Sequence, residues 1–267
     1  MNKIKVFVSG AGGKMGKEVV RTVLNQQDMV LVGASDSRHQ GKDVGELIGT
    51  RPLGIEVTGP LEAAYLKEAG ADVMVDFTNP QSVLKNAKSA LAAGVVPILG
   101  TTGLDENDIA EIRNLVDQTK VGAIIAPNFA IGAILMMRFA QEAAKYFPHV
   151  EIIEQHHDQK LDAPSGTALK TAEWISEVRK PMVQGHPNEY EKIKGSRGGD
   201  MEGIRIHSVR LPGFVAHQEV IFGGLGQALT IRHDAFSRES FMPGVMLAIR
   251  KASQVTKLII GLENFLD

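Results

Sequence analysis

The chain has 267 residues, enough for one large domain or two ordinary ones. Hydrophobic residues make up 43% and charged residues 22%, which excludes wholesale disorder and provides for a sizeable core. Lys and Arg number 29 against 31 Asp and Glu, so the net charge of -2 excludes a global attraction to nucleic acid or to an anionic membrane. The sequence contains no cysteine, which excludes disulfides, thiolate metal sites and a cysteine nucleophile.

The apolar runs of the sequence do not predict a signal peptide or a membrane-spanning segment. The first apolar run is too short for a signal peptide and reaches glycine at Gly10. Residues 121–137 come nearest to a membrane span, but Pro127 and Asn128 divide them, and neither part has the roughly 20 apolar residues that a span needs. We expect a strand, a turn and a helix there, in a cytoplasmic protein with no membrane or nucleic-acid partner.

Short β-branched runs alternate with helical patterns over the first half of the chain. Strands are predicted at residues 3–9, 29–35, 72–77, 95–99 and 121–126. Helices are predicted after the glycine-rich turn at 10–16, from Pro80 onward, and at 105–119. This alternation is typical of βαβ units, so we predict an α/β domain with a mainly parallel sheet.

The pattern changes after Phe129, which predicts a boundary between a domain of residues 1–129 and a domain of residues 130–239. The second part predicts helices at 131–146 and 167–179, a polar loop at 180–203, and strands at 149–155, 204–211, 218–222 and 228–233. Because short links join the last three strands, we expect an antiparallel or mixed sheet in a smaller α+β domain. A helix at 243–261 ends the predicted elements.

Four glycines lie where the first strand meets the first helix: Gly10, Gly12, Gly13 and Gly16. Without side chains, such a turn lets phosphate oxygens approach the amides of a helix N-terminus. The spacing departs from G-x-G-x-x-G, because Met15 occupies the third glycine position. Asp36 ends the next strand about 20 residues later, where a carboxylate accepts hydrogen bonds from an adenosine ribose. We predict dinucleotide binding; the alternative is a tight turn with a capping acid.

The residues around Asp36 favour the use of both NADH and NADPH. The carboxylate favours an unphosphorylated ribose, whereas nearby cations can neutralise a 2′-phosphate: Arg38, His39 and Lys42. Two further loops follow predicted strands at the same sheet edge, at residues 100–103 and 126–129. Their small and hydroxyl residues let the backbone reach a nicotinamide carboxamide, and ordinary connecting loops are the alternative.

The densest chemistry lies in residues 154–167, EQHHDQKLDAPSGT. His156 and His157 follow an apolar strand, and a bend after His156 would bring both imidazoles to one pocket that also receives Lys160. We expect the residues that open the next helix to present free backbone amides to an anion: Ser165, Gly166 and Thr167. This combination suits a small, carboxylate-rich substrate and acid–base chemistry by histidine.

Structural explanations compete with these assignments. The two adjacent histidines and the following Asp158 are a possible metal site, but there is no H-E-x-x-H motif and no further ligand is evident, so we expect no metal. Lys160 is a possible solvated surface charge. We assign no role to the histidines of the later strands, because most such residues are structural: His207, His217 and His233.

The sequence resembles the dihydrodipicolinate reductase family nearly from end to end. The motifs that carry the resemblance are VSGAGGKMG at residues 8–16, DFTNP at 76–80, GTTG at 100–103, APNFAIG at 126–132, EQHHDQKLDAPSGTA at 154–168, HSVRLPGFVAHQEVIFGG at 207–224 and LTIRHDAFSRESFMPGV at 229–245. The HHxxKxDAPSGTA stretch is highly specific. The glycine turn has the family's G-x-G-G-x-M-G form, which accounts for its unusual spacing.

The resemblance implies a Rossmann-like cofactor domain, completed by a C-terminal helix at about residues 240–267, and a smaller domain at 130–239 that binds substrate. It implies that the open mixed sheet of the smaller domain builds a homotetramer. The implied reaction is the NAD(P)H-dependent reduction of 4-hydroxy-tetrahydrodipicolinate, with loss of water, to tetrahydrodipicolinate. This reaction belongs to diaminopimelate and lysine biosynthesis.

The same resemblance implies roles for individual residues. His156 is the implied proton donor or acceptor and Lys160 a proton donor. The implied substrate-binding residues are His157, Gly166 and Thr167, to which the amide argument adds Ser165. The implied cofactor-binding residues are Gly10, Ala11, Gly12, Gly13, Lys14, Met15, Asp36, Gly100, Thr101, Thr102, Ala126, Pro127, Asn128 and Phe129.

Two other functions remain alternatives at this stage. One is a different two-domain NAD(P)-dependent dehydrogenase with a similar cofactor domain, because fold alone does not define function. The other is a non-catalytic NAD(P) sensor that keeps the glycine turn. A sensor has no need for His156, His157 and Lys160 together, so their joint presence favours an enzyme.

We predict that NADH and NADPH bind with dissociation constants within about a thousandfold of each other, which corresponds to roughly 4 kcal/mol. The reason is that Asp36 disfavours the 2′-phosphate while the cations beside it favour it. Fluorescence titrations of both cofactors at one ionic strength measure the ratio. A larger ratio would contradict the shared use of this loop.

Overall fold

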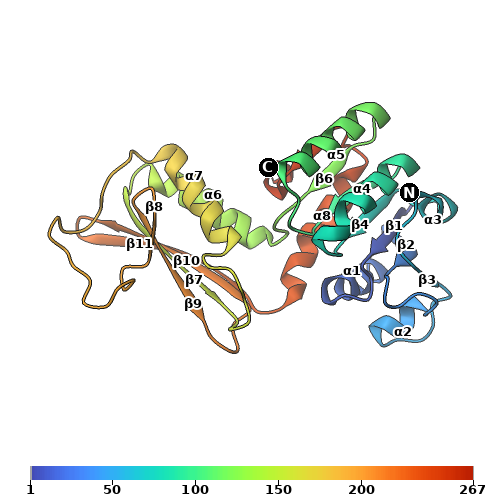
Figure 1. Ribbon diagram of the computed structural model, residues 1–267, viewed down its shortest axis with the longest axis horizontal. Coiled ribbons are helices and arrows are strands. Elements are labelled where there is room, and N and C mark those ends of the chain that lie inside the picture. The colour runs from blue at the N-terminus through green and yellow to red at the C-terminus, as the bar shows by residue number, and fades with distance from the viewer. Residues whose placement is uncertain (1, 267) are drawn as a thin grey trace. The chain divides into compact units, whose positions relative to one another are not determined.

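The computed structural model describes residues 2–266, and the chain forms two compact units (Figure 1). The first unit comprises the residues up to Phe129 together with those from Phe241 onward, and the second is Ala130–Ser240. Within residues 2–266, no helix combines the length and the apolar character needed to cross a membrane.

The first unit contains a seven-stranded sheet in which every pair of neighbours is parallel. The strands are β1 (Ile4–Ser9), β2 (Met29–Ser35), β3 (Val57–Thr58), β4 (Val73–Asp76), β5 (Val96–Leu99), β6 (Ala123–Ile125) and β12 (Leu258–Ile260). Their order is β12-β6-β5-β4-β1-β2-β3, so the direction of winding reverses between β1 and β4. Open α/β sheets bind ligands at such a reversal, outside the carboxyl ends of the strands.

Helices cover both faces of this sheet, which explains why its strands are continuous apolar runs. On one face, α1 (Lys14–Leu24) packs against α8 (Met242–Ala252). On the other, α4 (Pro80–Ala93) packs between α3 (Ala63–Glu68) and α5 (Glu106–Thr119) (Figure 1). Two short helices, α2 (Val44–Ile48) and η2 (Leu262–Phe265), complete the unit.

The second unit is a five-stranded mixed sheet with two helices on one face (Figure 1). It contains α6 (Ile131–Ala144), β7 (His149–His156), α7 (Gly166–Val178), β8 (Gly199–Met201), β9 (Ile204–Arg210), β10 (Ala216–Gly224) and β11 (Gln227–Ala235), and most of η1 (Arg238–Phe241), whose last residue begins the return to the first unit. The strand order is β11-β10-β7-β9-β8; β7 and β9 are parallel, and the other pairs are antiparallel. Along β7, Val150, Ile152 and Glu154 are buried and alternate with less buried residues.

The predicted α/β and α+β parts are confirmed, and most strand ranges agree to within two residues. The predicted helix at 243–261 is wrong in its second half, because α8 ends at Ala252 and β12 follows as a strand paired with β6. The sequence analysis also missed α2, β3, α3 and β8. These elements have two to six residues, too few to show a clear hydrophobic period.

Candidate functional site

The glycine turn closes between β1 and α1 because three of its positions have no room for a side chain. Gly10 has a positive φ of 79°. A Cβ atom at Gly16 would overlap the Gly10 carbonyl, and one at Gly12 would overlap the His39 ring. The close approach of helix to turn therefore requires glycine at position 16, which gives a physical reason for the departure from G-x-G-x-x-G.

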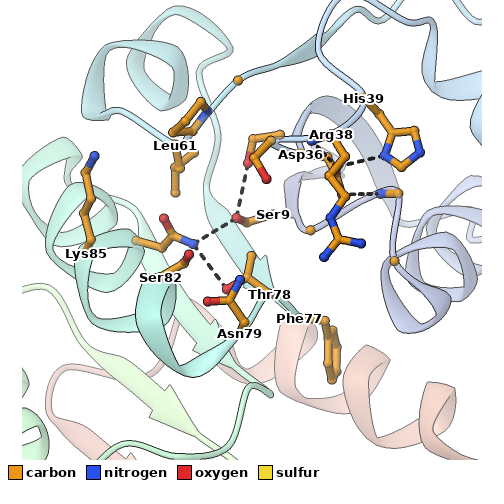
Figure 2. A pocket seen from close by; sticks show the side chains of 18 of the residues that line it. Ser9, Asp36, Arg38, His39, Leu61, Phe77, Thr78, Asn79, Ser82 and Lys85 are labelled. Atoms are coloured by element: carbon orange, nitrogen blue, oxygen red, sulfur yellow. Dashed lines mark hydrogen bonds and ion pairs between the residues drawn. The ribbon is translucent and has the colours of Figure 1, made fainter.

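Asp36 follows β2 and lies beside this turn (Figure 2). Its carboxylate accepts hydrogen bonds from the N–H groups of Gly12 (3.0 Å) and Arg38 (2.9 Å), and its Oδ1 lies 2.8 Å from Nδ1 of His39. Partial burial raises the pKa of Asp36, but the hydrogen bonds from His39, Arg38 and Gly12 outweigh it and lower the pKa overall. Asp36 is thus an ionised acceptor at the edge of the turn.

A pocket of about 330 Å³ opens at the carboxyl ends of β1, β2 and β4. The lining residues include Gly10, Gly12, Gly13, Asp36, Arg38, His39, Thr78 and Lys85. Figure 2 shows Arg38 and Lys85 on opposite sides of this pocket. The pocket has cations and a carboxylate beside a glycine cradle, a composition that fits a dinucleotide. Lys42 is not among its lining residues, so it is not one of the cations in this pocket.

A buried carboxylate, Asp76, ties the wall of the pocket together. Asp76 has no exposed surface and ends β4. It accepts hydrogen bonds from the hydroxyls of Thr78 (2.8 Å) and Thr101 (2.7 Å) and from the amide of Asn86 (2.7 Å). Asn86 also donates to the hydroxyl of Ser9 (3.2 Å). The loop at 100–103 is therefore fixed to the pocket through Thr101.

The loop at 126–129 meets the same edge of the sheet. The Ala126 amide donates to the Leu99 carbonyl, and the buried Phe129 ring lies 5.6 Å from that of Phe77, which lines the pocket. A Cβ atom at Gly100 would overlap the Phe77 ring, so any larger residue there would have to displace that ring. The structure thus places the ends of β1, β2, β4, β5 and β6 along one edge. Of the other predicted turn residues, Ala11 is buried, and Lys14 and Met15 begin α1.

In the second unit, the side chain of Glu154 connects several residues of the predicted histidine–lysine segment. Its side chain has 0% exposure. The guanidinium of Arg210 binds both carboxylate oxygens (2.7 and 2.9 Å), Nδ1 of His156 lies 2.6 Å away, and the Ser165 amide donates at 3.2 Å. Burial opposes ionisation of Glu154, but hydrogen bonds from His156, Arg210 and Ser208 lower its pKa from 4.5 to about 2. Sequence reasoning missed both Glu154 and Arg210, although a charged residue in the buried series of β7 signals a hidden partner.

The N-terminus of α7 is anchored beside this carboxylate. Ser165 is the N-cap, and its hydroxyl accepts a hydrogen bond from the Ala168 amide. The expectation of a free Ser165 amide is wrong, because that N–H donates to Glu154. Gly166 and Thr167 form the first turn of the helix.

The predicted residues His156, His157 and Lys160 differ in how they relate to the Glu154–Arg210 cluster. Nζ of Lys160 lies 2.6 Å from a carboxylate oxygen of Asp162, whose backbone carbonyl accepts a hydrogen bond from Arg210 (2.8 Å). His156 ends β7 with its ring against Glu154, whereas His157 follows the strand and is exposed. The Lys160 amide donates to the His157 carbonyl in a tight turn. The cluster thus contacts His156 directly and Lys160 through Asp162.

The later-strand histidines lie in contacts of other kinds. His207 pairs with Glu151 (2.8 Å) and His217 with Asp234 (2.7 Å), and burial lowers the pKa of His233. Among residues 2–266, no group of three or more His, Asp or Glu side chains is arranged to hold a metal ion.

Comparison with known proteins covers both units. Two family models match, the N-terminal part of dihydrodipicolinate reductase over residues 4–129 and the C-terminal part over residues 132–266. The chain is 84% identical over 267 residues to 4-hydroxy-tetrahydrodipicolinate reductase of Desulfitobacterium hafniense (strain DSM 10664 / DCB-2), covering 100% of each chain. It is 54% identical over 264 residues to the protein of that name from Syntrophomonas wolfei subsp. wolfei (strain DSM 2245B / Goettingen), covering 99% of each. The solved structure of dipicolinate-bound dihydrodipicolinate reductase from Paenisporosarcina sp. TG-14 is 48% identical, with a TM-score of 0.87 and coverage of 99% of this chain and 100% of that one.

We predict that the second unit loses stability in acid through Glu154. Its pKa is depressed from 4.5 to about 2 in the folded chain, so the stabilisation is complete above pH 4.5 and is lost as the pH falls toward 2. A shift of this size corresponds to about 3 kcal/mol. Urea unfolding at fixed protein concentration, followed by the fluorescence of the single tryptophan, Trp174 on α7, measures this loss.

The matched comparison is Glu154→Gln, which cannot titrate at this position. Its unfolding free energy should fall less steeply than that of the unsubstituted chain between pH 5 and pH 3. Equal slopes for the two proteins would contradict the assignment.

Proposed function

Since the chain belongs to the dihydrodipicolinate reductase family, we propose that it catalyses the NAD(P)H-dependent reduction of 4-hydroxy-tetrahydrodipicolinate to tetrahydrodipicolinate, with loss of water. The step belongs to diaminopimelate and lysine biosynthesis. The observation that carries the proposal is the cluster around Glu154, which holds His156 and the start of α7 in one place. Relatives named 4-hydroxy-tetrahydrodipicolinate reductase, which match over 99% or more of the chain, support it.

The first unit is the proposed cofactor domain for NADH and NADPH. The residues that would hold the cofactor are Gly10, Ala11, Gly12, Gly13, Lys14, Met15, Asp36, Gly100, Thr101, Thr102, Ala126, Pro127, Asn128 and Phe129. The glycine cradle and the pocket beside Asp36 support this assignment. When bound, the reduced nicotinamide supplies a hydride to the conjugated ring of the substrate.

The second unit is the proposed substrate domain. Its ligand is a small dicarboxylate, in line with the dipicolinate named for the Paenisporosarcina relative. We assign carboxylate binding to His157 and to the first turn of α7, Gly166 and Thr167, where the helix dipole favours an anion. Ser165 contributes by capping this helix.

Two side chains supply protons in the proposed reaction. Hydride addition to a conjugated imine leaves an enamine-like electron pair that an acid must protonate. Lys160 is an ammonium donor held by Asp162, and one ring nitrogen of His156 is engaged by Glu154. Each group therefore has one partner that orients it, as a positioned acid or base requires.

The assembly that we propose is a homotetramer formed through the open face of the five-stranded sheet, in the cytoplasm. Strand β11, at one edge of this sheet, is exposed over most of its length and supports this proposal.

The rival functions, another NAD(P)-dependent dehydrogenase or a non-catalytic sensor, are disfavoured by the complete histidine–lysine cluster. Cofactor binding without turnover of this substrate would favour them.

We predict that Lys160→Ala and His156→Ala each lower kcat by about 10²–10⁴-fold, because a positioned acid or base typically contributes a factor of this size. The assay follows oxidation of NADH or NADPH while the preceding synthase makes the substrate in situ from pyruvate and aspartate semialdehyde. Lys170→Ala is the control, because Lys170 is an exposed lysine on α7 paired with Glu173. Near-normal turnover in either site variant would refute that residue's role.

A further inference from the structure

We propose that Glu154 and Arg210 are the positioning residues of this site: together they hold the proton of His156 on Nδ1 and place the loop that carries Asp162 beside Lys160. This inference rests on the proposed function for the roles of His156 and Lys160. The positions themselves follow from contacts in the second unit alone.

The first part of the argument concerns the His156 tautomer. The Glu154 carboxylate has 0% exposure, so protein donors replace all of its water. Arg210 occupies one side of the carboxylate through both oxygens, and Nδ1 of His156 occupies another at 2.6 Å. Because an ionised carboxylate only accepts hydrogen bonds, Nδ1 must be the donor. Neutral His156 therefore has a bare Nε2, which is the nitrogen left to exchange a proton with substrate.

The second part concerns Lys160. One nitrogen of Arg210, Nη2, donates both to Glu154 (2.7 Å) and to the backbone carbonyl of Asp162 (2.8 Å). The side chain of Asp162 holds Nζ of Lys160 at 2.6 Å. A continuous series of contacts thus runs from His156 through Glu154, Arg210 and Asp162 to Lys160. The two proton-transfer groups share one buried anchor.

The sheet register explains why this anchor is rigid. Glu154 and His156 are two residues apart on β7, so their side chains lie on the same face. Arg210 lies opposite His156 on β9, the parallel neighbour of β7. The Leu211 amide also donates to the His156 carbonyl (3.1 Å), which continues the pairing past the end of β9. A one-residue shift of either strand would break the cluster.

The same strand offers a matched control. Glu151 contacts Arg197 (2.6 Å) and His207 (2.8 Å), so it forms a second carboxylate–arginine–histidine cluster. It lies three residues earlier, on the opposite face of β7, with its side chain 31% exposed. Its partners, Arg197 and His207, lie outside α7 and outside the turn that carries Lys160. Substitution of Glu151 therefore removes the same chemistry without touching the site.

The test compares Glu154→Gln with Glu151→Gln. A glutamine at 154 keeps the shape but has one oxygen, so binding of Arg210 by that oxygen turns an N–H donor toward His156. Nδ1 must then become an acceptor and the proton moves to Nε2. We expect kcat to fall by about 10²–10⁴-fold, as for a histidine in the wrong tautomer, with KM within about threefold. Glu151→Gln should keep kcat within about threefold.

Two readouts do not depend on turnover. Nitrogen-15 NMR of the histidine-labelled full chain reports the tautomer of His156, and calorimetry with dipicolinate reports carboxylate binding. We expect Nδ1–H in the unsubstituted chain, Nε2–H in Glu154→Gln, and equal dipicolinate affinity in both. A proton on Nε2 in the unsubstituted chain overturns the proposal even when Glu154→Gln does not fold. So does a folded Glu154→Gln chain with Nδ1–H and normal kcat, or an equal loss of kcat in Glu151→Gln.

These readouts separate this inference from the proposed function. A chain that shows the expected tautomers but no synthase-dependent cofactor oxidation would refute the reaction and leave the positioning of His156 intact. A chain that turns over substrate normally with His156 protonated on Nε2 would refute the positioning and leave the reaction intact.

Discussion

The burial of Glu154 constrains most of the second unit. Removing a carboxylate from water costs several kcal/mol unless its oxygens receive well-placed donors. Here the donors come from three separate parts of the chain: His156 at the end of β7, Arg210 at the end of β9, and the Ser165 amide before α7. The charge is tolerated only while these three segments stay together. The arrangement that stabilises the anion is therefore the arrangement that assembles the site.

A related design recurs in the first unit, without the arginine. Asp76 is also buried at the carboxyl end of a parallel strand, and it is satisfied by threonine hydroxyls and by an asparagine amide. Neutral donors hold the loops of the pocket in place while the cations at its rim, Arg38 and Lys85, remain available to a phosphate. In both units a buried carboxylate holds in place the loops to which we assign ligand binding.

Much of this fold and part of this site follow from local patterns in the sequence. The parallel strands are continuous apolar runs and the glycines mark the turn, so both are predictable from a few neighbouring residues. The contacts of Glu154 with Arg210 span 56 residues and depend on strand register, which no local pattern contains. Leu258–Ile260 was missed for another reason, since three apolar residues fit a helix and a strand equally well.

The return of the chain to the first unit from Phe241 onward affects how the protein folds while it is being translated. Strand β12 is the edge strand beside β6, α8 covers α1, and Arg250 binds Asp28 across 222 residues. The second unit, by contrast, is one uninterrupted segment, Ala130–Ser240. On the ribosome, the segment in the middle of the chain has all its strands before the earlier segment has its last one. The nascent N-terminal sheet is therefore incomplete during this interval, and the surface that α8 covers is still open to solvent. Chaperones would be needed in this interval.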